Sequence, residues 1–247
     1  MKMRNQQFIK YTNPSAFSVV IPVYNEAKRI EEGLKKILNF FNDNQFDYEI
    51  IIVDDGSTDQ TVKIIKEFCC PRIRILQHSK NKGKGAAVKT GALAAQKNFI
   101  LITDIDLSTP IEELYKLIPY LKNYDIVIAS RGVREAQIIQ RQPFYKELLG
   151  RLGNLLVQIL LLPGIKDTQC GFKLFKKKVQ KIFQKLTINS WGFDMEMLFL
   201  AKRAGLKIKE VGVIWENNPS SKVKLIDYAK VLYDLFKIKI NKLLLKY

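Results

Sequence analysis

The sequence predicts an α/β fold in which a mostly parallel sheet is flanked by helices and followed by C-terminal amphipathic helices. Two observations carry this prediction. Between residues 17 and 130, short apolar segments alternate with segments of helical spacing, which is the pattern of a parallel sheet covered on both faces. The segments YEIIIV and FILIT are unbroken apolar runs, as buried parallel strands are.

The elements of this first part can be placed in order along the chain. Strands are expected at residues 17–23, 48–53, 72–77, 99–103 and 125–129, and helices at 28–42, 57–68, 84–97 and 110–121. Ser57 has a side chain suited to cap the second helix. Pro110 suits the first turn of the fourth helix.

After residue 130 the alternation breaks. We expect a leucine-rich helix at 143–162, a strand at 170–175, a helix at 194–204, a strand at 207–215 and a last helix at 225–246. The chain therefore divides into a polar N-terminal segment at 1–16, one domain at 17–221 and a basic amphipathic C-terminal helix at 222–247.

The charge balance is strongly basic. The 247 residues include 41 Lys and Arg against 24 Asp and Glu, a net charge of +17. Such a balance predicts polyanionic partners: nucleic acid, an anionic membrane or phosphorylated substrates. Three cysteines without metal-ligand spacing favour a reducing cytosol. No signal peptide and no apolar run of about 20 residues is visible, so we expect no membrane span.

Acidic residues follow several of the predicted strands. Asp54 and Asp55 end the second strand, Asp104 and Asp106 follow the fourth, and Arg131 follows the fifth. Ligands of parallel sheets bind outside the carboxyl ends of the strands. These side chains are therefore expected to meet at one edge of the sheet.

A crowded acidic edge needs a cation because carboxylates repel one another. Mg²⁺ or Mn²⁺, held by Asp104, Asp106 and a diphosphate, fits this pattern. The alternative is that the two aspartates cap the helix that begins near Pro110; the second acidic pair on a neighbouring strand favours the ion. Residues 79–85 read SKNKGKG, whose glycines let backbone amides approach an anion, although a flexible loop is the simpler alternative.

Several motifs resemble the family 2 inverting glycosyltransferases of GT-A fold, a Rossmann-like architecture. They are IPVYNE at 21–26, VDDGSTD at 53–59, GKGAAVKTG at 83–91 and DID at 104–106. Three later motifs resemble the dolichyl-phosphate β-glucosyltransferase branch: KDTQCGFKLF at 166–175, WGFDMEML at 191–198 and SKV at 221–223. The resemblance runs from about residue 17 to 235, and it implies that 17–221 is a catalytic domain.

The resemblance implies a donor site for a UDP-sugar. The residues implied to hold the base and ribose are Pro22, Val23, Glu26, Asp54 and Asp55. Lys84 and Gly85 would lie over the nucleotide, Asp104 would face the ribose or sugar, and Asp106 would bind the metal. Asp167, Gln169 and the 191–196 segment would shape the sugar and acceptor pocket, and a loop with Ser221 and Lys222 would close over the donor.

The acceptor decides which catalytic groups are needed. A hydroxyl acceptor needs a general base, for which Asp194 and Glu196 are candidates; both could instead orient sugar hydroxyls. A phosphate acceptor, with a second pKa of about 6, is mostly dianionic at neutral pH and needs cations to dock it. The candidate phosphate ligands are Arg131, Arg134, Arg141, Arg151 and Lys222. The predicted catalytic set is Asp106, Arg131, Asp167 and Asp194.

Two segments favour a membrane surface. Residues 143–162 place leucines at helical spacing, and residues 222–247 hold seven lysines and two aspartates interleaved with apolar residues. A basic amphipathic helix lies in a membrane interface; the alternative for both segments is packing on the core. We expect a peripheral enzyme on the cytoplasmic face that binds no nucleic acid and transfers glucose from UDP-glucose to polyprenyl or dolichyl phosphate.

Three other functions remain open. One is a glycosyltransferase with a saccharide hydroxyl acceptor. Another is a sugar-phosphate nucleotidyltransferase. Such an enzyme needs a glycine-rich loop directly after the first strand, and this chain has IPVYNE there, which is not such a loop. The third is a non-enzymatic basic protein that binds membranes or nucleic acid, which gives no reason for acidic residues at the strand ends.

Overall fold

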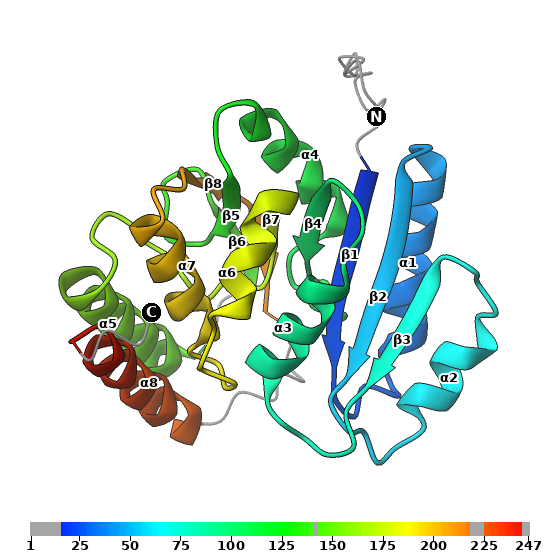
Figure 1. Cartoon of the computed structure of the whole chain (residues 1–247), viewed down its shortest axis with the longest axis horizontal. Coiled ribbons are helices and arrows are strands. Elements are labelled where there is room, and N and C mark those ends of the chain that lie inside the picture. Colours follow the sequence, from blue (N-terminus) through cyan, green and yellow to red (C-terminus); the bar gives the residue numbers. More distant parts are fainter. Residues whose placement is uncertain (1–15, 141–142, 218–224, 244–247) are drawn as a thin grey trace.

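A seven-stranded sheet forms the centre of the computed structural model, which describes residues 16–140, 143–217 and 225–243 (Figure 1). Its strands are β1 (Ala16–Val23), β2 (Asp47–Asp54), β3 (Ile73–Gln77), β4 (Phe99–Ile102), β5 (Ile126–Ser130), β7 (Lys173–Lys176) and β8 (Ile208–Gly212). Their order is β3-β2-β1-β4-β7-β5-β8. All pairings are parallel except those of β7, which is antiparallel to both of its neighbours.

Helices cover both faces of the sheet. They are α1 (Ile30–Asp43), α2 (Thr61–Glu67), α3 (Lys84–Ala94), α4 (Leu114–Leu117), α5 (Phe144–Leu160), α6 (Gln180–Gln184), α7 (Phe193–Arg203) and α8 (Leu225–Leu243). One apolar layer packs α1, α2 and α4 on the sheet, and the opposite layer packs α3 and α5 to α8. The predicted α/β fold is confirmed.

The strands of this core are largely apolar where both faces are covered. Ile50, Ile51, Ile52 and Val53 of β2 are each 0% exposed, so consecutive side chains enter opposite layers. The helix α1 turns one apolar stripe toward the sheet, through Ile30, Leu34, Ile37 and Phe41.

Three local predictions differ from the structure. Ser57 does not cap α2: its hydroxyl accepts the N–H of Asn25 at 2.8 Å, and α2 begins only at Thr61. The strand expected at 207–215 is divided into β8 and β9 (Ile214–Glu216), and β9 pairs with the unpredicted β6 (Gln137–Gln140) in a separate two-stranded sheet. The helix expected at 110–121 is a short α4 between 3₁₀ turns at Ile111–Glu113 and Ile118–Lys122.

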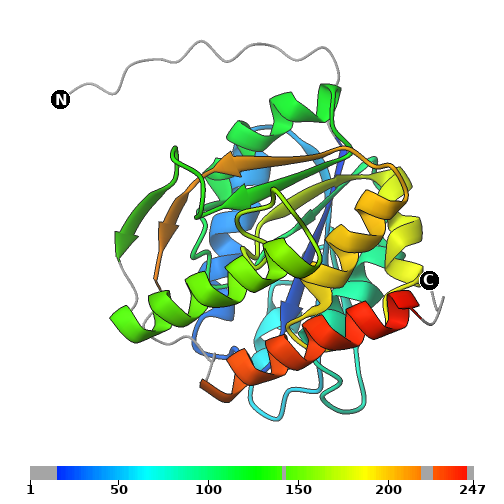
Figure 2. The ribbon, with the colours of Figure 1, turned by 90° about the vertical axis from the view of Figure 1, so that its left-hand side faces the viewer.

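The helices α5 and α8 lie side by side at one end of the molecule, beside the β6–β9 pair (Figure 2). None of the helices that the structure describes is both long enough and apolar enough to cross a bilayer. The predicted residues Arg141, Ser221 and Lys222 lie outside the described residues.

Candidate active site

The parallel strands bring the acidic residues to one edge of the sheet. Val23 and Asp54 are in register at the carboxyl ends of β1 and β2. The N–H of Asp55 donates to Val23 O at 2.8 Å, and the N–H of Thr103 donates to Val20 O at 3.1 Å. The segments that carry Asp55 and Asp104 therefore leave the sheet at the same edge.

Asp55 holds the loop that leads into α3. Its Oδ1 accepts the N–H of Lys82 at 2.9 Å and lies 2.7 Å from Nδ1 of His78, and its Oδ2 accepts the N–H of Gly83 at 2.8 Å. Asp54 accepts the N–H of Ser57 at 3.1 Å. Both carboxylates are buried, so protein groups already use oxygens that the prediction offered to a nucleotide base.

The other predicted nucleotide contacts lie at the end of β1. Val23 is buried, and Pro22 is half-buried beside it. Glu26 accepts two hydrogen bonds from Arg29, at 2.8 and 2.9 Å. The guanidinium of Arg29 also reaches toward Asp106, with 3.8 Å between Nη1 and Oδ2.

Lys84 is the cation at the centre of this edge. Its Nζ lies 2.6 Å from Oδ1 of Asp104 and 5.1 Å from the ring centre of Trp191. Burial alone would lower the pKa of Lys84, but the negative charges of Asp104 and Asp194 outweigh burial and raise it. Lys84 is therefore a permanent cation at neutral pH. The next residue, Gly85, has no room for a side chain because Phe193 and the 188–190 backbone lie against it.

Asp104 and Asp106 line a small pocket. Its other lining residues are Thr103, Ser108, Thr109, Gly171, Phe172 and Trp215. Oδ1 of Asp106 accepts the N–H of Ser108 at 3.1 Å. Burial, and then the negative charge of Asp104, raise the pKa of Asp106 more than the N–H of Ser108 and the charges of Lys84 and Arg29 lower it.

The pair fits a hard divalent cation. Mg²⁺ or Mn²⁺ is commonly bound by one or two protein carboxylates, while substrate phosphates and water supply the other ligands. The unfavourable ionisation of Asp106 beside Asp104 would be relieved by such a charge. Among the described residues no cluster of three or more His, Cys, Asp or Glu side chains could hold a metal alone, so the donor substrate would complete the site.

Arg131 is locked in place by Asp167. The carboxylate accepts the N–H of Arg131 at 2.9 Å, its Nε–H at 2.7 Å and its Nη2–H at 2.9 Å. Burial alone would raise the pKa of Asp167, but the Arg131 charge and hydrogen bonds outweigh burial and lower it. The guanidinium lies 5.3 Å from the ring centre of Trp215, which lines the pocket.

Gln169 lies two residues beyond Asp167. Its N–H donates to Oδ1 of Asp167 at 3.1 Å. Its side-chain Nε2 is buried with no hydrogen-bond partner among the described residues. A buried donor of this kind is costly, and a bound hydroxyl or phosphate oxygen would satisfy it.

Asp194 forms a buried ion pair at the start of α7. Its Oδ1 lies 2.6 Å from Nζ of Lys173, whose side chain is only 1% exposed. Burial raises the pKa of Asp194 more than Lys173 and Lys84 lower it. Glu196 is fully buried and accepts the N–H groups of Thr187 and Ile188 at 2.9 and 2.8 Å. Glu196 therefore holds the loop that begins at Thr187.

Three of the five candidate phosphate ligands, Arg131, Arg134 and Arg151, lie among the described residues. Arg134 lies exposed in the turn before β6, and Arg151 lies exposed on α5, 3.8 Å from Glu147. Neither forms an ion pair with the pocket carboxylates among the described residues. Arg131 is the member that the fold places beside the pocket.

Comparison with known proteins agrees with this geometry. The family model described as glycosyl transferase family 2 matches residues 18–183. The chain belongs to this family. It is also 35% identical to dolichyl-phosphate beta-glucosyltransferase ALG5D of Trichomonas vaginalis over 90% of this chain and 72% of that one. It is 34% identical to the dolichyl-phosphate beta-glucosyltransferase of Homo sapiens, over 83% of this chain and 69% of that one.

Solved structures with this fold include proteins in complex with a nucleotide sugar and Mn²⁺. Glucosyl-3-phosphoglycerate synthase of Mycobacterium tuberculosis, in complex with Mn²⁺, UDP-glucose and glycerol 3-phosphate, matches with a TM-score of 0.68 at 20% identity, over 91% of this chain and 80% of that one. Mannosyltransferase PcManGT of Pyrobaculum calidifontis, in complex with GDP-Man and Mn²⁺, matches with a TM-score of 0.61 at 19% identity, over 93% and 65%. At these identities the likeness shows the fold.

The family 2 assignment confirms the predicted resemblance, the GT-A fold and the prediction of a glycosyltransferase. The residues of the site that were not predicted include Arg29, Gly171, Lys173 and Trp215. Lys173 carried a usable signal, since a lysine within the buried strand FKLF needs an anionic partner. Arg29 and Trp215 carried none, because their contacts depend on how distant loops pack.

Proposed function

We propose that this family 2 glycosyltransferase transfers glucose from UDP-glucose to a dolichyl or other polyprenyl phosphate, with inversion at the anomeric carbon. One observation carries the proposal. Two carboxylates, Asp104 and Asp106, line one pocket, and two fixed cations lie against its lining: Lys84 pairs with Asp104, and Arg131 lies over Trp215. The names of the similar proteins agree with this donor and acceptor.

The donor side is built for a leaving diphosphate. Asp104 and Asp106 are the residues that would hold Mg²⁺ or Mn²⁺, which would neutralise charge on the departing UDP. Lys84 supplies a second, protein-borne positive charge at the same place, and its ion pair with Asp104 limits its freedom. A fixed charge in a buried site stabilises developing negative charge without reorganisation.

The acceptor side is built for a phosphate. A phosphomonoester is a nucleophile at neutral pH without a general base, and it needs a directed cation. Arg131 is such a cation because Asp167 fixes its orientation through the backbone N–H, Nε–H and Nη2–H together. The alternative, a saccharide hydroxyl acceptor, needs a base. Asp194 has the raised pKa of one, but Lys173 occupies its Oδ1.

Product formation tests the proposal directly. The purified chain would be incubated with radiolabelled UDP-glucose, UDP-galactose or GDP-mannose, Mn²⁺ and a short-chain polyprenyl phosphate. We expect a labelled, organic-soluble product with UDP-glucose that disappears when EDTA is added. Absence of labelled lipid with every donor, together with labelling of a saccharide acceptor, would instead support the alternative.

We also propose that the enzyme reaches its lipid acceptor by docking α5 and α8 on an anionic membrane. The helix α5 exposes a run of large apolar side chains: Phe144 (79% exposed), Leu148, Leu149, Leu152, Leu155, Leu156 and Ile159 (68%). The neighbouring α8 exposes Tyr233, Phe236 and Ile240 together with Lys230, Lys237, Lys239 and Lys242. Apolar side chains beside lysines suit insertion among anionic headgroups.

Vesicle sedimentation tests this surface. The variant Ile159→Glu should lose most binding to vesicles that contain phosphatidylserine. Leu93→Glu on α3, where Leu93 is 37% exposed, should bind as the unmodified chain does. A different outcome would show that a second copy covers this face instead. In that case the unmodified chain forms dimers and does not bind vesicles, and Ile159→Glu dissociates the dimers.

A further inference from the structure

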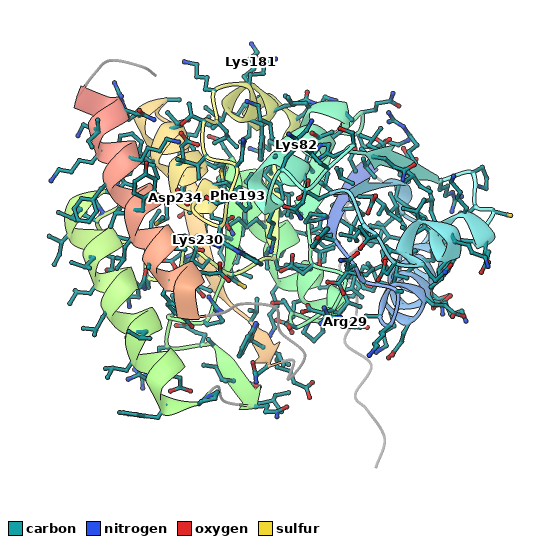
Figure 3. All side chains as sticks on the ribbon, turned by 90° about the horizontal axis from the view of Figure 1, so that it is seen from below. Arg29, Lys82, Lys181, Phe193, Lys230 and Asp234 are labelled. Atoms are coloured by element: carbon teal, nitrogen blue, oxygen red, sulfur yellow. The ribbon has the colours of Figure 1, made fainter. Side chains whose placement is uncertain are left out.

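A buried aspartate of α8 reaches across to the loop that precedes α7. Asp234 is only 6% exposed. Its Oδ2 accepts both the hydroxyl of Ser190 and the N–H of Gly192, the latter at 3.2 Å. Gly192 has no room for a side chain, since a methyl group there would lie 2.4 Å from Cβ of Asp234. Figure 3 labels Asp234 on α8 and Phe193 at the start of α7.

A second contact from α8 holds the beginning of the same loop. Asn241, also buried, donates from Nδ2 to Oγ1 of Thr187 at 3.1 Å. Glu196 of α7 accepts the N–H of Thr187 from the other side. The loop at 187–193 is therefore held at both ends, and α8 supplies one contact at each end.

The opposite side of this loop lies against the residues around Lys84. The N–H of Ala86 donates to Asn189 O at 3.3 Å. A methyl group at Gly83 would lie 2.4 Å from that same carbonyl oxygen, so the two backbones are in direct contact. Trp191 lies under Lys84, with 5.1 Å between Nζ and the ring centre. Any shift of the 187–193 loop is thus transmitted to the loop that places Lys84.

An aspartate is a costly choice for this role. A helix that only packs on a core does so through apolar side chains, as Leu235 and Ile238 of α8 do. A buried carboxylate must recover its desolvation through hydrogen bonds. Among the described residues, Asp234 does so by binding the turn between Ser190 and Gly192.

We propose that Asp234 is a positioning residue of the donor site, through which α8 fixes the Trp191 turn and, by way of that turn, Lys84. This role depends on the proposed function in one respect: it assumes that Lys84 binds the nucleotide diphosphate. The helix α8 thereby has two faces: Asp234 and Asn241 hold the active site, and Tyr233, Phe236 and Ile240 are exposed.

Hydrogen–deuterium exchange with mass spectrometry tests the link without any substrate. In Asp234→Ala we expect amides to lose protection both at 187–193 and at 83–86, although no residue of α8 makes a hydrogen bond to 83–86 among the described residues. Asp234→Asn should keep protection in both segments, because one amide oxygen can accept both donors. Loss confined to 187–193 would overturn the proposal.

The dissociation constant of UDP with Mn²⁺, measured by calorimetry, gives a second readout. Asp234→Ala should raise it by about tenfold, since small misplacements of positioning groups carry large costs, and Asp234→Asn should restore it. The matched control is Asp125→Ala, which removes a buried aspartate that accepts the N–H of Lys207 at 3.0 Å at the far edge of the sheet.

The control separates positioning from general stability. Asp125→Ala should lower the melting temperature and leave UDP affinity unchanged. Equal UDP affinity in Asp234→Ala and Asp125→Ala would contradict a positioning role. If the unmodified chain does not bind UDP, the proposed donor is wrong, but the exchange experiment still decides whether Asp234 holds the 83–86 segment. If Asp234→Ala fails to fold, Ser190→Ala can replace it. That variant removes one of the two hydrogen bonds and should give a smaller loss of protection in both segments.

Discussion

A methyl group added at Gly171 would lie 2.1 Å from Oδ2 of Asp104. The glycine of the QCGFKLF motif therefore makes room for a carboxylate from a strand end almost seventy positions earlier in the chain. This contact explains why the segment that leads into β7 has no side chain at this point, and it leads to a prediction about the donor site.

Gly171→Ala should displace Asp104 and reduce the rate of sugar transfer by roughly tenfold to a hundredfold, as misplaced catalytic groups do. Steady-state kinetics with UDP-glucose would measure the effect. Gly153→Ala in α5 is the matched control, because nothing lies within 4 Å of its added methyl group. It should keep full activity and raise the melting temperature, since alanine favours a helix by about 1 kcal/mol over glycine. Full activity in Gly171→Ala would show that the position of Asp104 is immaterial.

Lys84→Met should lower kcat/KM for UDP-glucose by roughly a hundredfold while the protein stays folded. The substitution keeps an unbranched side chain over Trp191 and removes the charge that Asp104 holds. Loss of one preorganised charge at a leaving group has costs of this size. Lys97→Met, which removes the exposed pair with Asp47 at the other edge of the sheet, should leave the kinetics unchanged. Equal kinetics in the two variants would refute a role for Lys84 in transfer.

Asp167→Asn should destabilise the protein at neutral pH and flatten its acid sensitivity. The pKa of Asp167 is lowered in the folded state, so the unfolded chain binds the proton more readily. The stabilisation is therefore present above the ordinary aspartate pKa of about 3.9 and is lost as pH falls through the lower folded value. The Arg131 and Asp167 side chains are 29% and 8% exposed, so we expect a cost below the roughly 3–5 kcal/mol lost when one partner of a fully buried pair is removed.

Urea denaturation of Asp167→Asn and the unmodified chain at pH 7, 4 and 3 would show this effect. We expect the difference in unfolding free energy to be largest at pH 7 and to shrink toward pH 3. Asp47→Asn, at a half-exposed pair with Lys97, should change the unfolding free energy by less than about 1 kcal/mol. A pH-independent difference for Asp167→Asn would mean that its charge is not what stabilises the fold.

Much of the fold was predictable because strands buried on both faces are uniformly apolar. β4 (FILI) is entirely apolar, β2 contains the unbroken apolar run IIIV, and α1 has a clear apolar stripe. The strand β6 could not be predicted, because its sequence QIIQ is exposed at all four positions. The antiparallel direction of β7 was equally hidden, since direction depends on how the chain returns to the sheet and leaves no mark on composition.

The site was predictable where chemistry follows directly from strand ends. Asp104 and Asp106 could be placed because ligands gather at the carboxyl edge of a parallel sheet. The partners that fix these groups could not. Asp234 contacts Ser190 from 44 positions away, and Lys173 meets Asp194 only because α7 begins over β7. Such pairs are set by packing between layers, which periodicity does not report.

The most direct test of the whole account is the transfer rate of Asp106→Asn with saturating Mn²⁺ and UDP-glucose. Asparagine keeps an oxygen for the N–H of Ser108, so the fold should survive while the negative charge for the metal is lost. We predict that the rate falls at least about a thousandfold. The control Glu32→Gln, at an exposed ion pair on α1, should leave the rate unchanged. A rate for Asp106→Asn within twofold of the unmodified chain would contradict the account.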